Sequence, residues 1–392
     1  MSDPTIQVVT SVAALSVAIW LYLIFFRGGF WRADQRLGPM AVPDSAWPDI
    51  AVIVPARDEA QVIGKTVGAL LAQDYPGRFA VLLIDDASSD GTARIARAVP
   101  GAEQRLTVIS GSPPPGGWTG KLWALATGVD RAAALLPDAR YLLFSDADID
   151  HHPAALRALV AKAEAERLDL VSLMALLTCT TGWERLLVPA FVYFFQKLYP
   201  FAWVNDPANA MAAAAGGCVL VRRDALARAG GIAAISDALI DDCALARLIK
   251  RRGAIWLGLT ETTRSIRGHG GFGDGLGDIW AMVVRTAFFQ LRYSVARLVA
   301  AVAGMLVIYV MPPLALAVGL LMGSGSLAGL GLAACILMAA AYGPTLGLYR
   351  QPRAAAVLLP VAALFYMAMT IDSAWRHWRG RGGQWKGRFY KK

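Results

Sequence analysis

The sequence predicts an α/β domain built on a parallel-rich sheet, joined to membrane-spanning helices at both ends of the chain. Between residues 48 and 260, short apolar runs of strand length alternate with runs of helical spacing. That alternation is typical of a parallel sheet covered by helices on both faces. Long charge-free stretches flank this region, and 392 residues leave room for both parts.

The charge-free stretches are residues 4–26, 298–349 and 354–371. A membrane span needs about 20 apolar residues. Residues 298–349 are therefore long enough for two spans, joined at Gly323-Ser324-Gly325-Ser326. The whole chain is 56% hydrophobic and only 17% charged, whereas soluble domains carry about 25% charged residues. A buried core helix would not explain a charge-free run as long as residues 298–349.

Basic residues indicate the orientation of the chain. Arg27, Arg32 and Arg36 follow the first apolar stretch, which favours a retained anchor over a cleaved signal peptide and places residues 27–296 in the cytosol. We therefore expect a multi-pass protein of the inner (cytoplasmic) membrane. The basic tail, residues 373–392, suits an anionic lipid surface. Nucleic acid is not an expected partner. Three C-terminal crossings would put this tail outside, so the number of crossings stays open.

Four scattered cysteines form no CxxC pair: Cys179, Cys218, Cys243 and Cys335. This pattern fits a reducing compartment and argues against a zinc site.

The central elements follow one another in a regular order. Strands are expected at 49–56, 79–86, 105–110 and 140–148, and helices at 60–74, 90–99 and 121–136, with Ser88 or Ser89 able to cap the second helix. Ligands of such sheets bind at the carboxyl ends of the strands. The polar loops PARDEA, DDASSDGT, GSPPPGGWTGK and SDADIDHH all fall there.

Asp146 and Asp148 end the strand expected at 140–148, and Asp150 follows it. Alternate residues of a strand share a face, so Asp146 and Asp148 are expected to flank one cation. Mg²⁺ commonly takes one or two carboxylates together with substrate phosphates, and a metal on a diphosphate would neutralise a leaving group. An acidic surface turn is the alternative for this motif.

Further acidic groups lie at three other points. Asp85-Asp86 and Arg57-Asp58-Glu59 also end strands, although a capping turn would explain the first pair. Asp241 and Asp242 lie near the start of a helix expected at 236–250. The helix dipole alone favours acids there, and a general base acting on an acceptor hydroxyl is the functional alternative.

Three further segments allow more than one interpretation each. Residues 186–203 form either an interfacial helix, the roof of a groove or a core helix. Arg292 in QLRYS is either a diphosphate clamp or a membrane-flanking arginine. The Gly-rich residues 264–278 are either a lid over phosphates or a linker.

Several motifs then occur together in one order: VIVPARDEA, DDASSDGT, GWTGKLWAL, SDAD, GGCVLVRRDAL, LIDDCALA, QLRYS and WKGRFY. With them the chain resembles membrane-anchored family 2 glycosyltransferases of the ceramide-glucosyltransferase-like kind, and among these the hopanoid-biosynthesis-associated group. The resemblance covers about residues 45–295. It implies a GT-A fold, a nucleotide-sugar donor such as a UDP-sugar, Mg²⁺ or Mn²⁺, and a lipid acceptor such as a hopanoid, another polyisoprenoid or a ceramide-like alcohol.

The resemblance also implies roles for individual residues. Asp146 and Asp148 match the metal-binding DxD pair, and Asp242 matches the catalytic base, with Asp241 in place of the Glu before it. The donor nucleotide-sugar is expected at Pro55, Arg57, Glu59, Asp86, Lys121, Asp146, Gln290, Arg292 and Tyr293. Here Tyr293 replaces a tryptophan of the family signature, and Gln290 stands two residues before Arg292 instead of three.

The implied organisation has five parts. They are an anchor at 1–27, a cytosolic GT-A domain at 28–271, an interfacial segment at 272–296, C-terminal spans at 297–372 and a basic tail at 373–392. A base opposite the leaving group implies inversion at the sugar. The alternatives are a processive polysaccharide synthase, for which three C-terminal apolar runs are few, and a silent membrane scaffold, against which the complete acidic set argues.

Overall fold

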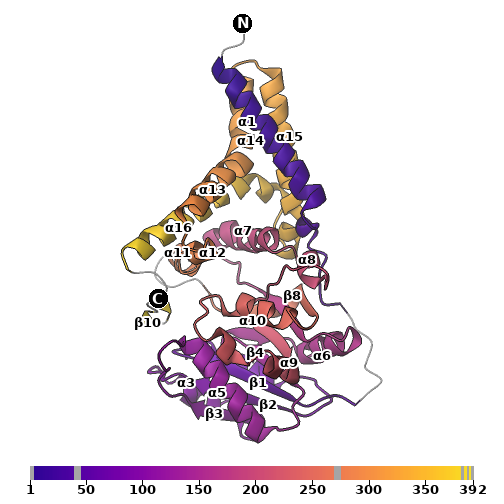
Figure 1. Cartoon of the computed structure of the whole chain (residues 1–392), viewed down its shortest axis with the longest axis vertical. Coiled ribbons are helices and arrows are strands. Elements are labelled where there is room, and N and C mark those ends of the chain that lie inside the picture. Colours follow the sequence, from indigo (N-terminus) through magenta and orange to yellow (C-terminus); the bar gives the residue numbers. More distant parts are fainter. Residues whose placement is uncertain (1–3, 39–45, 269–274, 381–383, 386–387, 390–392) are drawn as a thin grey trace. The chain divides into compact units, whose positions relative to one another are not determined.

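The computed structural model describes residues 4–38, 46–268, 275–380, 384–385 and 388–389, and the chain divides into two compact units. The sheet unit comprises residues 34–178 and 201–267. The helical unit comprises residues 1–33, 179–200 and 268–392. Figure 1 shows both units, coloured along the sequence.

The sheet unit is built on one eight-stranded mixed sheet, in the order β3-β2-β1-β4-β7-β6-β8-β5. Its first four strands are parallel to one another, whereas β7 runs antiparallel to both of its neighbours, and β5 runs antiparallel to β8. The strands are β1 (Ile50–Ala56), β2 (Phe79–Asp85), β3 (Leu106–Ser110), β4 (Tyr141–Ser145), β5 (Ile149–His151), β6 (Leu170–Leu176), β7 (Cys218–Arg222) and β8 (Ile255–Ser265).

Helices follow most of these strands, as the alternating pattern predicts. They are α2 (Ile63–Leu71), α3 (Thr92–Arg97), α4 (Ala102–Arg105), α5 (Gly120–Leu135), α6 (Ala155–Ala165), α8 (Phe201–Asn205), α9 (Arg223–Arg228), η2 (Ile232–Ile235) and α10 (Asp241–Lys250). The helix α5 packs against β1 and β2, where Gly128 lets it approach closely: a Cβ there would lie 2.3 Å from Cγ2 of Ile53.

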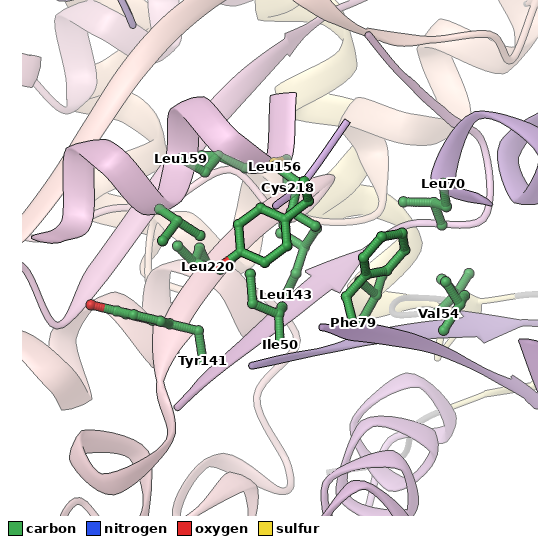
Figure 2. Close-up of a cluster of buried hydrophobic side chains, with 14 of the residues drawn as sticks. Ile50, Val54, Leu70, Phe79, Tyr141, Leu143, Leu156, Leu159, Cys218 and Leu220 are labelled. Carbon is green, nitrogen blue, oxygen red and sulfur yellow. The ribbon is translucent and has the colours of Figure 1, made fainter. Parts of the chain in front are cut away.

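The core of the sheet unit forms because the central strands are buried on both faces. Ile50, Val54 and Leu143 are at most 1% exposed and pack with residues of α2 and α6, as Figure 2 shows. The Tyr141 hydroxyl at the edge of this core donates to Glu164 at 2.6 Å. This rigid centre holds the carboxyl ends of β1, β2 and β4 in place.

Two local expectations are wrong. The N-cap of α3 is Gly91 with a left-handed φ of 89°, and the carboxylate of Asp90, not Ser88 or Ser89, accepts from the backbone of Thr92. The strand expected at 140–148 ends at Ser145. Asp146 and Asp148 therefore lie in the turn between β4 and β5, because the chain must reverse there to pair β5 with β8.

Within its described residues, the helical unit contains four helices long and apolar enough to cross a membrane, over residues 6–26, 295–321, 325–348 and 353–378. Its elements are α1 (Pro4–Phe26), η1 (Phe30–Arg32), α7 (Gly182–Leu198), α11 (Leu276–Val284), α12 (Ala287–Gln290), α13 (Val295–Met305), η3 (Leu306–Val310), α14 (Met311–Leu321), α15 (Gly325–Leu348), η4 (Arg353–Leu358) and α16 (Leu359–Trp378). The hairpin β9–β10 (Gln384–Trp385 and Arg388–Phe389) ends the described chain.

The apolar segment at 186–203 divides at Tyr199. Most of it forms α7, which begins with a capping box between Thr181 and Glu184 and belongs to the helical unit. The remainder forms α8 in the sheet unit.

Candidate active site

The candidate site lies in the sheet unit, at the carboxyl ends of β1 and β4 and at the start of α10. A pocket there is lined by Pro55, Lys121, Asp146, Gly216, Asp241 and Asp242, together with apolar side chains. Crossovers between parallel strands place their carboxyl ends at one edge, so residues distant in sequence meet there.

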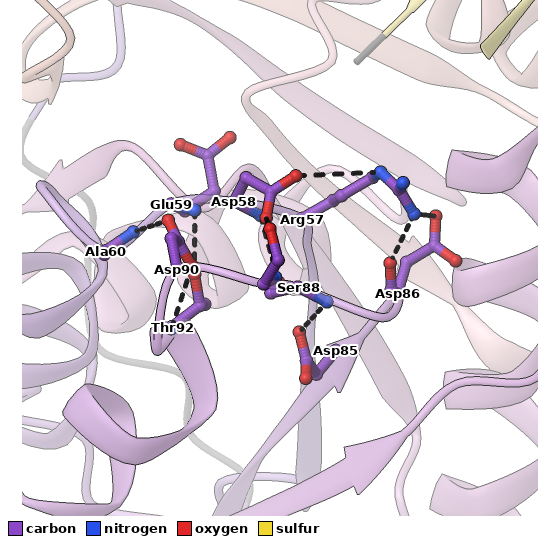
Figure 3. Close-up of polar contacts among 10 residues, drawn as sticks. Arg57, Asp58, Glu59, Ala60, Asp85, Asp86, Ser88, Asp90 and Thr92 are labelled. Atoms are coloured by element: carbon purple, nitrogen blue, oxygen red, sulfur yellow. Dashed lines mark hydrogen bonds and ion pairs between the residues drawn. The ribbon is translucent and has the colours of Figure 1, made fainter. Parts of the chain in front are cut away.

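The loops after β1 and β2 are tied together by their own polar groups, as Figure 3 shows. The backbone N–H of Asp58 donates to Ser88 Oγ at 2.9 Å, that of Glu59 to Thr92 Oγ1 at 2.8 Å, and that of Ala60 to Asp90 Oδ2 at 2.8 Å. This network fixes the backbone that carries Arg57 and Glu59. Asp58 and Asp90 have a structural role in it.

Arg57 bridges the same two loops from the site side. Its Nη1 donates to the backbone oxygen of Asp86 at 2.7 Å and lies 3.6 Å from the Asp86 carboxylate. Asp86 is only 4% exposed, so this guanidinium offsets a carboxylate that is largely removed from water. Three of the residues expected to hold the nucleotide, Arg57, Asp86 and Pro55, thus lie together at the ends of β1 and β2.

Lys121 joins the acidic groups of two distant segments. Its Nζ lies 2.9 Å from Asp146 Oδ1 and 3.1 Å from Asp241 Oδ2. Burial alone would lower the pKa of Lys121, but the carboxylates of Asp146 and Asp241 outweigh it and raise that pKa. The lysine therefore stays charged and holds the end of β4 beside the start of α10.

Asp242 has the protonation behaviour of a general base. Its Oδ2 accepts from the backbone N–H of Gly216 at 2.9 Å, and its Oδ1 accepts from the N–H of Cys243 at 2.6 Å. Burial, followed by the negative charge of Asp241, raises the pKa of Asp242 to about 6. A carboxylate with this pKa is ionised at pH 7 and is a stronger base than an exposed aspartate.

Asp148 is held by a residue that the sequence did not single out. Its Oδ2 accepts from Ser265 Oγ at 2.9 Å and from Arg267 Nε at 3.1 Å. The same guanidinium donates from Nη2 to both oxygens of Glu59, at 2.6 and 2.7 Å. Arg267 thus occupies a position between two carboxylates, one from each side of the site.

The Gly-rich segment 264–278 offers Arg267 as a candidate site residue, but the sequence does not indicate that its partner is Asp148. Pairing of β5 with β8 sets Ile149 opposite Ser265, and this long-range register alone brings Arg267 to Asp148. Within that segment, residues 269–274 lie outside the described residues.

A buried pair, Ser145 and His151, flanks the acidic turn that carries Asp146 and Asp148. The Ser145 hydroxyl lies 2.9 Å from His151 Nε2, and both residues are at most 3% exposed. Burial lowers the pKa of His151 to about 4, so the ring is neutral at pH 7. The pair joins the end of β4 to β5, on either side of Asp146 and Asp148.

The donor set suits a divalent cation shared with a substrate. Among the residues that the structure describes, no group of three or more His, Cys, Asp or Glu side chains is placed to hold a metal ion. Two carboxylates one residue apart, with the Asp146 side chain 35% exposed, match the way Mg²⁺ uses one or two carboxylates plus phosphate oxygens. Asp146 and Asp148 fit such an ion, and a closed protein cage does not form.

The three remaining predicted residues lie in the helical unit. Gln290 donates to the hydroxyl of Tyr199, and the ring of Tyr293 stacks on His377 with centroids 4.2 Å apart. Arg292 and Tyr293 both have left-handed backbones, with φ of 53° and 55°. This turn ends α12 and leads into α13.

A family model matches part of the chain. Residues 51–230 match the model of Glycosyl transferase family 2. The matched range includes β1, β4 and the Asp146–Asp148 turn, and it ends before Asp241 and Asp242.

Two curated relatives match part of the chain. Glycosyltransferase AglE of Haloferax volcanii is 30% identical over 128 residues, which is 32% of this chain and 39% of that protein. Dodecaprenyl-phosphate galacturonate synthase of Rhizobium johnstonii is 29% identical over 125 residues, covering 31% and 35%. The matched part thus spans well under half the length of these relatives.

A solved structure resembles nearly the whole chain. The mannosyltransferase PcManGT from Pyrobaculum calidifontis, in complex with GDP-Man and Mn²⁺, is 20% identical with a TM-score of 0.53, covering 94% of this chain and 99% of that one. The likeness supports the GT-A-like mixed sheet with apolar helices at both ends, and at this identity it concerns the fold alone.

Proposed function

We propose that this chain is an inverting glycosyltransferase that moves a sugar from a nucleotide-sugar donor to a lipid acceptor at the membrane. The observation that carries the proposal is the junction made by Lys121. One ammonium group holds Asp146 of the DxD turn and Asp241 at the start of α10, so the donor-side carboxylates and the base Asp242 line one pocket.

The donor would lie along the ends of β1, β2 and β4. Pro55, Arg57, Glu59 and Asp86 are assigned to the nucleotide, and Asp146 and Asp148 are assigned to Mg²⁺ or Mn²⁺. When bound, such a cation neutralises charge on the departing diphosphate. The solved complex of PcManGT with GDP-Man and Mn²⁺ supports this class of donor, while the resemblance in the sequence motifs favours a UDP-sugar. Gln290, Arg292 and Tyr293 remain proposed contacts to the diphosphate.

Asp242 would accept the proton of the acceptor. The acceptor oxygen forms a bond to the anomeric carbon as the bond from that carbon to the diphosphate breaks, and the electron pair leaves with the phosphate. The proton passes to Asp242, whose pKa of about 6 suits proton transfer near neutral pH. Attack opposite the leaving group inverts the anomeric centre.

The base bears on the chemistry of the acceptor. An alcohol must lose a proton during attack, whereas a phosphate monoester already offers an anionic oxygen. The raised pKa of Asp242 therefore favours an alcohol as the acceptor, such as a hopanoid, another polyisoprenoid alcohol or a ceramide-like lipid. The relative named for dodecaprenyl phosphate makes a polyprenyl phosphate the second candidate acceptor.

A transfer assay tests the proposal. Detergent-purified protein is incubated with radiolabelled UDP- and GDP-sugars, Mn²⁺, and either polyisoprenoid alcohols or polyprenyl phosphate. We expect a lipid-soluble product that Asp242→Asn abolishes with an alcohol, while Asp237→Asn, an exposed aspartate five residues earlier, retains activity. Label appearing only in water-soluble products from all donors would contradict the lipid acceptor.

A further inference from the structure

The helix α16 exposes an apolar stripe along one side. Val361, Leu364, Ile371, Trp375 and Trp378 are between 41% and 54% exposed, and their spacing of three, seven, four and three residues places them on one face. The opposite face is buried in the helical unit, with Ala362, Met369 and Ala374 at most 1% exposed. This exposed stripe requires an apolar partner.

The buried face of α16 packs on the short segments α11 and α12 and on α7, and also on α13 and η3 of the 295–321 helix. The Tyr366 hydroxyl donates to Leu187 O of α7 at 2.8 Å. Ser373 donates to Val284 O at the end of α11 at 2.5 Å and accepts from the N–H of Phe288 of α12 at 3.0 Å. Figure 1 shows α16 running beside α11, α12 and α13. Since α11 has nine residues and α12 four, neither spans 30 Å.

The C-terminal end of α16 lies where the span 295–321 begins. Its His377 ring stacks on Tyr293, two residues before α13. Residues 284–293, which α16 contacts, come directly before that span in the chain. The end of α16 is therefore at the starting level of the 295–321 helix.

The N-terminal end of α16 lies at the same level. The helices α14 and α15 form a close antiparallel hairpin, because the Cβ positions of Gly319 and Gly331 would fall 2.3 Å from the backbone N atoms of Ala328 and Leu316. The chain thus returns through α15 to the side where 295–321 started, and η4, which begins at Arg353, and α16 follow after Arg350. Both ends of α16 are on one side.

Charge agrees with this arrangement. Arg27, Arg292, Arg297, Arg350 and Arg353 flank the spans on the side where α16 begins and ends. The opposite turn, residues 322–324 between α14 and α15, carries no charge. Seven Lys and Arg residues also occupy 376–392, and a fourth crossing would carry them to the side that lacks basic residues, against the usual distribution of Lys and Arg.

We propose that only three helices cross the membrane, namely α1, the α13–η3–α14 helix and α15, and that α16 lies in the membrane–water interface. Its stripe enters one leaflet, with Trp375 and Trp378 in the headgroup region. The basic tail leaves on the side of Arg27 and meets anionic lipid headgroups there. This inference is independent of the proposed enzymatic function.

Lipid is the occupant that the surroundings of the stripe favour. Exposed apolar residues at the start of the 295–321 helix, Val295 and Val299, lie at the same level as the stripe, and Arg376 and Arg379 stand beside its tryptophans. This combination of an apolar face, terminal tryptophans and flanking arginines is typical of interfacial helices. The alternative occupant of the stripe is a second copy of the chain.

Cysteine labelling of the full chain in cells tests the side of the tail. The Gly383→Cys, Glu103→Cys and Gly325→Cys variants are treated with a membrane-impermeant maleimide before and after permeabilisation, and the unsubstituted chain gives the background of its four cysteines. We expect Gly383→Cys to label together with Glu103→Cys and oppositely to Gly325→Cys. Labelling of Gly383→Cys together with Gly325→Cys would establish a fourth crossing and overturn the proposal.

Depth measurements test the orientation of α16 itself. Nitroxide labels are placed at Leu364→Cys, Ile371→Cys and Trp378→Cys in vesicles with phosphatidylglycerol. These sites are about 21 Å apart end to end along a helix. An interfacial helix predicts depths that agree within a few Å, whereas a crossing helix predicts a spread above about 10 Å.

The same labels identify the occupant of the stripe. Contact with lipid predicts relaxation by oxygen dissolved in the bilayer at all three sites. Shielding from oxygen, with line broadening between labels on different chains, would show a second copy on the stripe and overturn the assignment to lipid. If a cysteine variant fails to fold, a C-terminal fluorescent-protein fusion locates the tail instead. The fusion fluoresces only when the tail is cytosolic.

Discussion

Replacing Arg267 should strengthen the binding of a divalent cation to the nucleotide-free protein. Arg267 donates to Asp148, which we propose as a metal ligand, and to both oxygens of Glu59. A cation must therefore take Asp148 from a guanidinium that already compensates its charge. Arg267→Gln removes that competitor and leaves the carboxylate available.

The expected size follows from the contacts and their exposure. A hydrogen bond to a charged group contributes about 1.5–3 kcal/mol when it is well shielded. The Arg267 side chain is 43% exposed, so solvent screening reduces its competition to about 1 kcal/mol. Because 1.4 kcal/mol corresponds to a tenfold change, Kd for Mn²⁺ should fall about fivefold.

The assay is Mn²⁺ binding followed by electron paramagnetic resonance or calorimetry on detergent-purified protein without nucleotide. Arg267→Lys keeps the positive charge and should shift Kd less than Arg267→Gln does. Arg264→Gln, a nearby arginine whose Nε donates to the backbone of Glu261, serves as the control. Unchanged or weaker Mn²⁺ binding in Arg267→Gln would refute the competition between guanidinium and metal.

Three further predictions follow. With an alcohol acceptor, kcat should rise with pH through about 6 as Asp242 ionises. Lys121→Met should move this rise to higher pH, because the charge of Lys121 lowers the pKa of Asp242. A rise at the same pH in both proteins would contradict the electrostatic effect of Lys121 on Asp242. Since the pKa of Asp242 is raised from 3.8 to about 6 in the fold, its ionisation lowers stability by roughly 3 kcal/mol as pH rises from 4 to 6. Asp242→Asn should therefore raise Tm relative to wild type more at pH 7.5 than at pH 4, and an equal difference at both would argue against it. Gly128→Ala should destabilise the sheet unit by about 1–3 kcal/mol because its Cβ meets Ile53, whereas Gly343→Ala, with nothing within 4 Å, should not, as thermal unfolding would measure.

The parallel half of the sheet is predictable from the sequence because its signals are local. β1, β2, β3 and β4 are apolar runs bounded by polar loops, and helices of clear spacing separate them. The other half is not, because β6, β7 and β8 acquire their order and direction through pairing between distant segments. Nothing in the sequence near Cys218 indicates that β7 runs antiparallel between β4 and β6.

The same distinction applies to the candidate site. Sequence motifs select Asp146, Asp148 and Asp242, and the structure brings Asp146 and Asp242 to one pocket, with Asp148 in the adjoining turn. Their partners are not predictable. The motif does not reveal that Lys121 holds Asp146 while Arg267 holds Asp148, since each pairing depends on how α5 and β8 meet the turn after β4.

The central claim is that the acidic turn after β4 holds a cation that in turn holds a nucleoside diphosphate. The most direct test measures binding of UDP and GDP to the purified protein, with and without Mn²⁺, for wild type, Asp148→Ala and Asp150→Ala. Asp150 is the control because it belongs to the same acidic run but pairs with Lys65. We predict binding that requires Mn²⁺, is lost in Asp148→Ala and persists in Asp150→Ala. Binding that needs no metal, or that survives in Asp148→Ala, would contradict the claim.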